Sequence, residues 1–219
     1  MKNRRLPAVA LCILAACQPL ETSELTRAVV AKDNGAVARL LSAGAAPDEG
    51  KPRPIVWAAR LGNRDAIRLL AKAGADVNRE DGGNDWTPIQ HAVHKRQADS
   101  ISTLIELGAD PNRRSGNAPS ALMMAAGYGD LASVNVLLAN GADPSLEISP
   151  GINALWAALG GGAIADITDG PPLGSCFPKV VARIREAAPR LRVARNGETK
   201  AMRVIAKEGC AALIDATLE

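Results

Sequence analysis

The chain repeats one phrase four times, a pair of long aliphatic residues that runs into a turn of small residues. The turn glycines of the four copies, which lie 30, 34 and 33 residues apart, are Gly44, Gly74, Gly108 and Gly141. A period near 33 residues is typical of arrays in which each repeat is a small helical unit that stacks on the next. The repeat therefore constrains both the fold and the kind of function that we expect.

The second copy shows what each unit is expected to form. Residues 54–59 predict a short helix, Gly62 predicts a turn, and residues 65–72 predict a second helix that Gly74 ends in a left-handed conformation. Aliphatic residues recur at helical spacing in the second helix, so one of its faces is apolar. One pair of helices cannot bury that face alone, and stacking of neighbouring pairs is therefore required.

The third copy carries the sequence Thr-Pro-Ile-Gln-His-Ala at residues 87–92. The Thr can cap a helix and the Pro suits its first turn. This segment resembles the T-P-L-H-x-A motif of the ankyrin-repeat family, and the period is similar to that of the same family. The resemblance covers four repeats over residues 24–145. It implies an all-α fold, an ankyrin-repeat α-solenoid of stacked helix-turn-helix units with short finger loops.

The pattern weakens beyond residue 145. Residues 152–158 predict the first helix of a fifth repeat, and residues 179–187 predict its second helix. Between them, the segment 160–177 is rich in Gly and Pro and is expected to be an insertion. We therefore expect an elongated fifth repeat over residues 146–188.

A sixth repeat is expected to cap the array over residues 189–219. Residues 201–209 align without gaps on residues 66–74, the second helix and the turn glycine of the second copy. The alignment predicts that the second helix of the last repeat ends at Gly209. Residues 24–219 would then form one continuous domain.

The first residues are typical of a segment that is removed during export. Three basic residues among the first five precede an apolar run, residues 6–16, that is too short to span a bilayer. Residues 14–17, Leu-Ala-Ala-Cys, resemble the lipobox of bacterial lipoproteins. The resemblance implies a signal peptide at 1–16, a lipid on Cys17 and a short linker over 17–23. An ordinary secretory signal cut elsewhere is the alternative.

The same resemblance implies a location. A lipid on Cys17 would anchor the protein in the bacterial envelope, facing the periplasm. Gln18 stands where an inner-membrane retention signal usually has Asp, which favours the outer membrane over the inner one.

Removal of the signal would also change the charge balance. The chain has 26 basic and 23 acidic residues, and the segment before Cys17 holds three basic residues and no acidic one. The mature chain would therefore carry 23 of each, a formal charge of zero. This balance gives no support to a nucleic-acid partner. We expect a monomer that meets the membrane only through its lipid.

The cysteines predict a staple near the C-terminus. Cys12 would leave with the signal and Cys17 would carry the lipid, so Cys176 in the insertion and Cys210 near the end would remain. Export would take both to an oxidising compartment. A disulfide between them would contribute on the order of 3 kcal/mol in the chain-entropy model. Two buried free thiols are the alternative.

The sequence contains no constellation that predicts catalysis. His91 and His94, the only histidines, lie three residues apart with no nearby Cys or carboxylate to complete a metal site. The G-x-G-x-x-A pattern at residues 160–165 follows an expected helix rather than a strand, unlike a dinucleotide-binding motif. Ser175 lacks an obvious base. We therefore expect a protein that is not an enzyme and holds neither a metal nor a cofactor.

The family resemblance also implies a binding surface. In ankyrin repeats, partners bind the finger loops and the exposed side of each first helix, which form a concave face. The residues that this register places there are Trp86, Tyr128, Arg60, Lys95, His94, Arg113 and Arg114. Exposed aromatic residues often act as binding anchors. The alternative for Trp86 is that it shields the edge of the next repeat. The alternative for the four cations, Arg60, Lys95, Arg113 and Arg114, is that they are only solvated.

The leading functional hypothesis is a non-catalytic protein-binding module, either an adaptor or an inhibitor, possibly of the immunity type. The alternative is a structural or stress-protective envelope protein that supports a periplasmic enzyme. The sequence does not distinguish an adaptor from an inhibitor.

Overall fold

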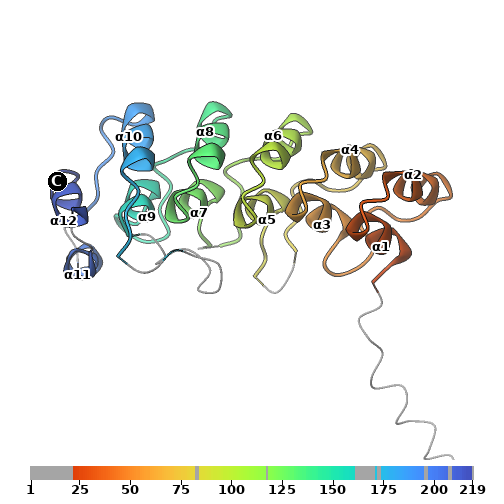
Figure 1. The fold of residues 1–219 in the computed structure, drawn as a ribbon, viewed down its shortest axis with the longest axis horizontal. Coiled ribbons are helices and arrows are strands. Elements are labelled where there is room, and N and C mark those ends of the chain that lie inside the picture. The colour runs from red at the N-terminus through yellow and green to blue at the C-terminus, as the bar shows by residue number, and fades with distance from the viewer. Residues whose placement is uncertain are drawn as a thin grey trace, which may run out of the picture.

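The chain forms an elongated array of helix pairs, and the computed structural model describes residues 22–81, 84–116, 118–160, 171, 174–194, 197–206 and 209–218. In these residues the helices alternate between two rows (Figure 1). The inner row holds α1 (Glu24–Val30), α3 (Pro54–Arg60), α5 (Pro88–His94), α7 (Ala121–Gly127), α9 (Ala154–Gly160) and α11 (Gly197–Ile205). The outer row holds α2 (Asn34–Ser42), α4 (Arg64–Lys72), α6 (Ala98–Glu106), α8 (Leu131–Ala139), α10 (Pro178–Ala187) and α12 (Cys210–Asp215).

Each helix packs against its partner in the pair, and up to α9 and α10 each also packs against its neighbours in the same row. From α1 to α9, every inner helix contacts the next inner helix, and from α2 to α10 every outer helix contacts the next outer helix. The array is therefore held together by contacts between neighbouring repeats, as expected for a solenoid. The predicted all-α solenoid is confirmed.

Local sequence signals set the helix ends. Thr87 and Gln90 form the reciprocal capping box at the start of α5, and Pro88 occupies its first turn. Asn63 caps α4 by accepting a hydrogen bond from the backbone N of Ala66 (3.1 Å). Gly74 follows α4 with a φ of 98°, a left-handed conformation that favours glycine.

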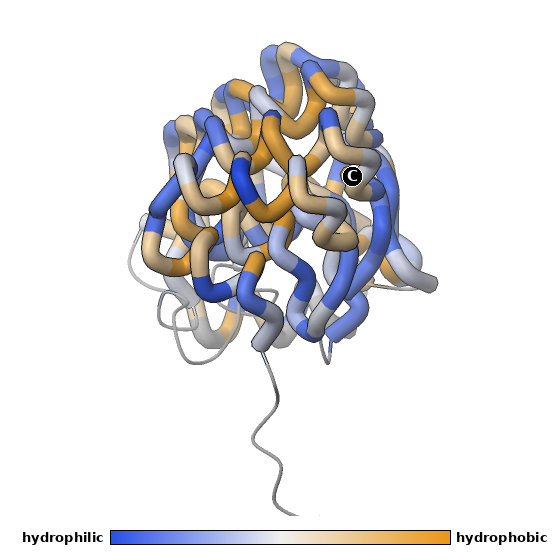
Figure 2. Tube along the Cα trace, turned by 90° about the vertical axis from the view of Figure 1, so that its right-hand side faces the viewer, coloured by the Kyte–Doolittle hydropathy of each residue, from blue (hydrophilic) through white to orange (hydrophobic). Residues whose placement is uncertain are grey.

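The hydrophobic core runs along the array between the two rows. Ile67 and Leu70 of α4 are fully buried, together with Ile55 of α3. Figure 2, which views the array end-on, shows hydrophobic and hydrophilic stretches alternating along the chain. The pattern follows from amphipathic helices that each bury one face against their neighbours.

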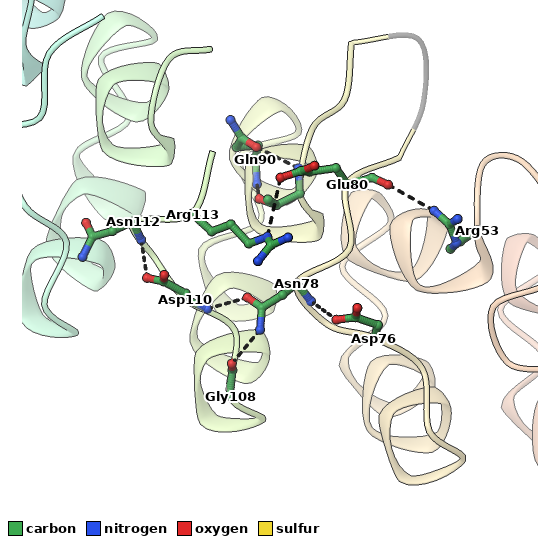
Figure 3. Close-up of polar contacts among 10 residues, drawn as sticks. Arg53, Asp76, Asn78, Glu80, Gln90, Gly108, Asp110, Asn112 and Arg113 are labelled. Carbon is green, nitrogen blue, oxygen red and sulfur yellow. Dashed lines mark hydrogen bonds and ion pairs between the residues drawn. The ribbon is translucent and has the colours of Figure 1, made fainter. Parts of the chain in front are cut away.

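A ladder of asparagine side chains joins the turns that follow the outer helices (Figure 3). Asn78 donates from Nδ2 to the carbonyl of Gly108 (3.0 Å) and accepts at Oδ1 from the backbone N of Asp110 (2.7 Å). One repeat later, Asn112 makes the equivalent bonds to the turn at Gly141 and Asp143. The ladder fixes the spacing of successive turns because each amide satisfies one donor and one acceptor of the next.

The last helix pair differs from the predicted register. The second helix of the sixth repeat was expected to end at Gly209, but the structure makes α11 the inner helix and places Gly209 before α12. Val193 is extended, and its backbone N donates to the carbonyl of Thr217 (3.2 Å). Since this segment is paired with the C-terminal residues, the inner helix begins later than in the other repeats. Met202 of α11 is then buried next to α9.

Candidate functional site

The finger loop before α5 is held firmly at its base. The backbone N of Asp81 donates to the carbonyl of Trp86 (2.9 Å). Arg53, at the start of α3, donates from Nη1 to the carbonyl of Glu80 (3.1 Å) and forms an ion pair with Asp81 (3.4 Å), whose carboxylate also accepts from the backbone N of Arg53. Hydrogen bonds and an ion pair therefore hold the finger loop against the preceding repeat. Trp86 lies at the end of this loop, just before α5.

Trp86 lies over two histidines of α5. Its ring centroid is 5.5 Å from that of His91 and 5.3 Å from that of His94, both in tilted arrangements that aromatic rings favour. Trp86 is half-buried and packs against the core with one side. The rest of the side chain is partly exposed to solvent, and its role as a binding anchor stays a prediction.

His91 is buried and electrically neutral. Its Nε2 lies 3.2 Å from the carbonyl of Asp81, so Nε2 carries the proton and donates. Its Nδ1 is then an acceptor, and Arg60 donates to it from Nη1 (3.3 Å). The pKa of His91 is lowered from 6.5 to about 4, mainly because burial disfavours the charged ring; the bond to the Asp81 carbonyl partly offsets this effect, and the Arg60 charge adds to it.

Tyr128 does not lie where the sequence placed it. Its side chain is only 3% exposed, so its expected exposure on the binding face is wrong. The hydroxyl lies 2.9 Å from Nδ1 of His94, and the two rings are 6.0 Å apart. His94 is also buried, contrary to its expected place on the solvent face. The reason is that Tyr128, at the end of α7, reaches back to α5 and closes over His94 one repeat earlier.

Two arginines also lie over aromatic rings in this region. Arg60 lies 5.7 Å from the ring centroid of Trp57, and Arg96 lies 5.9 Å from that of Tyr128, distances at which a cation is attracted to an aromatic face. Arg96 also donates from Nη2 to the carbonyl of Tyr128 (3.1 Å). Sequence reasoning missed Arg96. Its signal was its place directly after Lys95, in the turn that follows α5.

We call the group formed by these side chains the aromatic-basic cluster. Its members are Arg60, Trp86, His91, His94, Arg96 and Tyr128. Three successive inner helices position them, because Arg60 ends α3, the two histidines lie on α5 and Tyr128 follows α7. The cluster combines four rings with two guanidinium groups.

The other predicted cations lie differently. Arg113 forms an ion pair with Glu80 (3.5 Å), and Arg114 donates to the carbonyls of Ala118 (3.3 Å) and Glu147 (2.8 Å). Both guanidinium groups thus tie finger loops together, and Figure 3 shows the contact of Arg113. Lys95 is half-buried at the end of α5. The predicted basic strip is therefore divided between the finger bases and the cluster.

The C-terminal staple is present. Cys176 and Cys210 form a disulfide with an S–S distance of 2.01 Å, which joins the segment before α10 to the start of α12. Cys17 and the signal peptide lie outside the described residues, as do residues 161–170 of the insertion.

The residues that the structure describes show neither a metal-ligand cluster nor a membrane-spanning helix. Among those residues, no group of three or more His, Cys, Asp or Glu side chains is placed to hold a metal ion. None of the helices described is both long enough and apolar enough to cross a membrane.

Comparison with protein families identifies the repeats. A family model of ankyrin repeats in three copies matches residues 25–115, and a model of a single ankyrin repeat matches residues 120–147. Together the matches cover more than half of the 219 residues and include the whole aromatic-basic cluster. Comparison with curated proteins found no match.

Proposed function

The chain belongs to the ankyrin-repeat family, and we propose that it is a non-catalytic protein-binding module whose partner docks on the aromatic-basic cluster. The observation that carries this proposal is the half-buried indole of Trp86, which contacts His91 and His94 in the cluster that also holds Arg60 and Arg96. Tryptophan and arginine are the residues most often found as energetic anchors of interfaces.

The contacts of Trp86 favour binding because the side chain is already held in place and loses little conformational entropy when a partner binds. The finger base is fastened by Arg53, and the indole rests on His91 and His94. A side chain that is already held loses little conformational entropy when a partner covers it. The proposal therefore assigns to Trp86 the role of a preformed anchor.

We also propose where the module works. A lipid on Cys17 would hold the array at the bacterial envelope, on the periplasmic side and at the outer rather than the inner membrane. The basic and then apolar order of the first residues and the sequence Leu-Ala-Ala-Cys support this proposal. In that place the module would serve as an adaptor or as an inhibitor of the immunity type.

The anchoring is tested with Cys17→Ser. The variant should lose incorporated radiolabelled lipid and leave the membrane fraction. A variant that stays in that fraction, together with a wild-type protein that takes up no label, would show that the protein is not a lipoprotein.

The binding role is tested with Trp86→Ala and a matched control. Leu107→Ala removes a large side chain that is 37% exposed after α6, in the outer row. Proteins captured from envelope extracts are identified, and the affinity for the captured partner is measured at a temperature where all variants are folded. We expect Trp86→Ala to lower the affinity for the partner at least about tenfold. Leu107→Ala should leave this affinity unchanged. Equal affinity of the wild type and Trp86→Ala would remove the cluster as the docking site.

A further inference from the structure

Arg60 and Arg96 are linked to Trp86 through different neighbours, Arg60 through His91 and Arg96 through Tyr128 and His94. Each guanidinium lies over an aromatic ring, and each donates to a neutral acceptor, Nδ1 of His91 or the carbonyl of Tyr128. Within the described ranges, neither forms an ion pair with a carboxylate. Two oriented guanidinium groups without an ion-pair partner therefore belong to the same cluster as the half-buried indole of Trp86.

We infer that the partner segment carries two carboxylates that flank one apolar side chain. The carboxylates bind Arg60 and Arg96, and the apolar side chain packs on Trp86. This inference rests on the proposed function, since it specifies the chemistry of the partner at the same surface.

The donors available on each arginine support this chemistry. A guanidinium has five N–H donors, and the neutral acceptors described here use one on each side chain. The remaining donors suit a carboxylate, which guanidinium groups bind through two parallel hydrogen bonds. A guanidinium stacked on a ring is also weakly hydrated, so it loses less on contact with a partner than an ammonium would.

The charge around the cluster also favours an acidic partner. From α1 to α9 the inner helices contain a single acidic residue, Glu24, which lies in the first turn of α1. Two carboxylates of the finger are engaged elsewhere, because Asp81 pairs with Arg53 and Glu80 pairs with Arg113. Asp85, which precedes Trp86, is exposed, so one carboxylate stands against the two arginines here. A partner with carboxylates would therefore meet positive charge on this face, and like charges would repel a basic partner.

The helix spacing sets the separation of the two carboxylates. Arg60 reaches from α3 to α5, and Arg96 reaches from the end of α5 to the end of α7. The two cations are thus about one helix spacing apart, roughly 8–10 Å. A chain in the polyproline II conformation has three residues per turn and rises about 3.1 Å per residue, so carboxylates three residues apart point to the same side about 9 Å apart and match this distance. The motif expected in a partner segment of this conformation is Glu-apolar-x-Glu.

The test uses three synthetic peptides and the full chain. The first peptide contains Ser-Glu-Leu-Ser-Glu-Ser, the second replaces both Glu by Gln, and the third replaces both by Lys. Binding is followed by calorimetry and by tryptophan fluorescence at low and high salt, up to millimolar peptide. The variants are Arg60→Gln with Arg96→Gln, and the control Arg39→Gln, which removes one exposed charge from the outer helix α2.

The wild type should prefer the Glu peptide over the Gln peptide at least about threefold, as two partly screened ion pairs allow, and the preference should shrink at high salt. The double variant should lose the preference, whereas Arg39→Gln should keep it. Equal binding of the Glu and Gln peptides to the wild type, or no binding of either, overturns the inference. So does a preference that survives in the double variant.

These outcomes are separate from those of the proposed function. Loss of partner capture in Trp86→Ala without any peptide preference would keep the protein-binding role and reject the acidic motif. A peptide preference with unchanged capture in Trp86→Ala would keep the two cation subsites and reject Trp86 as the anchor of the natural partner.

Discussion

Acidification should destabilise this array through His91. The side chain is 4% exposed, and its two nitrogens are matched to a neutral ring, with Nε2 donating to the carbonyl of Asp81 and Nδ1 accepting from Arg60. Protonation at Nδ1 would replace that acceptor by a donor and place a positive charge against the guanidinium. The folded state therefore resists protonation, and the unfolded chain does not.

The size of the effect follows from the two pKa values. His91 has a pKa of about 4 in the folded state, below the ordinary value of 6.5 that it regains on unfolding. Between these values the unfolded chain binds a proton that the folded chain does not, so the free energy of unfolding falls as the pH falls. The full loss below pH 4 is about 3 kcal/mol, and most of it is reached by about pH 4.5. Above pH 6.5 the term vanishes.

The assay compares the wild type with His91→Gln, whose amide can donate to Asp81 and accept from Arg60 without titrating. Urea unfolding at several pH values gives two stability profiles, and the carboxylates contribute the same background to both. The wild type should lose about 2–3 kcal/mol more than the variant between neutral pH and about pH 4.5. NMR titration of the imidazole signals gives the pKa directly, because the chain has only two histidines.

Parallel stability profiles for the two proteins would refute this reasoning. So would an imidazole signal of His91 that titrates near its ordinary pKa in the folded protein, because the buried neutral ring would then not be the cause of any acid sensitivity.

Three further changes probe the packing. Tyr128→Phe should lower the free energy of unfolding, measured with urea, by about 1 kcal/mol, because it removes the hydroxyl that is hydrogen-bonded to His94. Tyr128→Ala should lower it by about 3–5 kcal/mol because it opens a cavity. A substitution at an exposed residue would have a smaller effect. Leu70→Ala should cost about 2–5 kcal/mol and should affect peptide binding only through unfolding. Peptide mapping without reduction should recover Cys176 joined to Cys210. Reduction should speed hydrogen exchange in α10 and α12 before it does so in α4 and α6, because a disulfide that closes a loop of this length contributes about 3 kcal/mol to the free energy of unfolding.

The fold could be predicted from the sequence because its signals are local and repeated. The capping box at Thr87, the left-handed Gly74 and the buried Leu70 each depend on a few neighbouring residues, and each recurs with the period of the array. The prediction was wrong for the last helix pair because its register depends on a contact between residues that are distant in the sequence. Val193 pairs with the C-terminal residues, and no periodic pattern in the sequence records that pairing.

The site was predicted only in part for a related reason. The register assigned Trp86 and Arg60 to one face, but it treated each repeat as a separate surface. The burial of Tyr128 depends on His94, which lies 34 residues earlier, and the orientation of Arg60 depends on His91, which lies 31 residues later. Both separations are close to one period. Polar and aromatic residues one period apart should therefore be considered as contacts between neighbouring inner helices.

The use of polar side chains along the array indicates where a partner can be recognised. The amide of Asn78 is hydrogen-bonded to the next turn, and Arg113 and Arg53 form ion pairs with carboxylates of the finger. These groups maintain the spacing of the repeats, and few of their donors and acceptors remain for a partner. Arg60 and Arg96 are held by neutral acceptors and keep their charge. A surface of this kind can acquire a new partner by exchange of the residues around Trp86 at little cost to the array, whereas exchange in the ladder would alter the stacking itself. The separation of these two tasks is the physical reason to look for specificity at the aromatic-basic cluster.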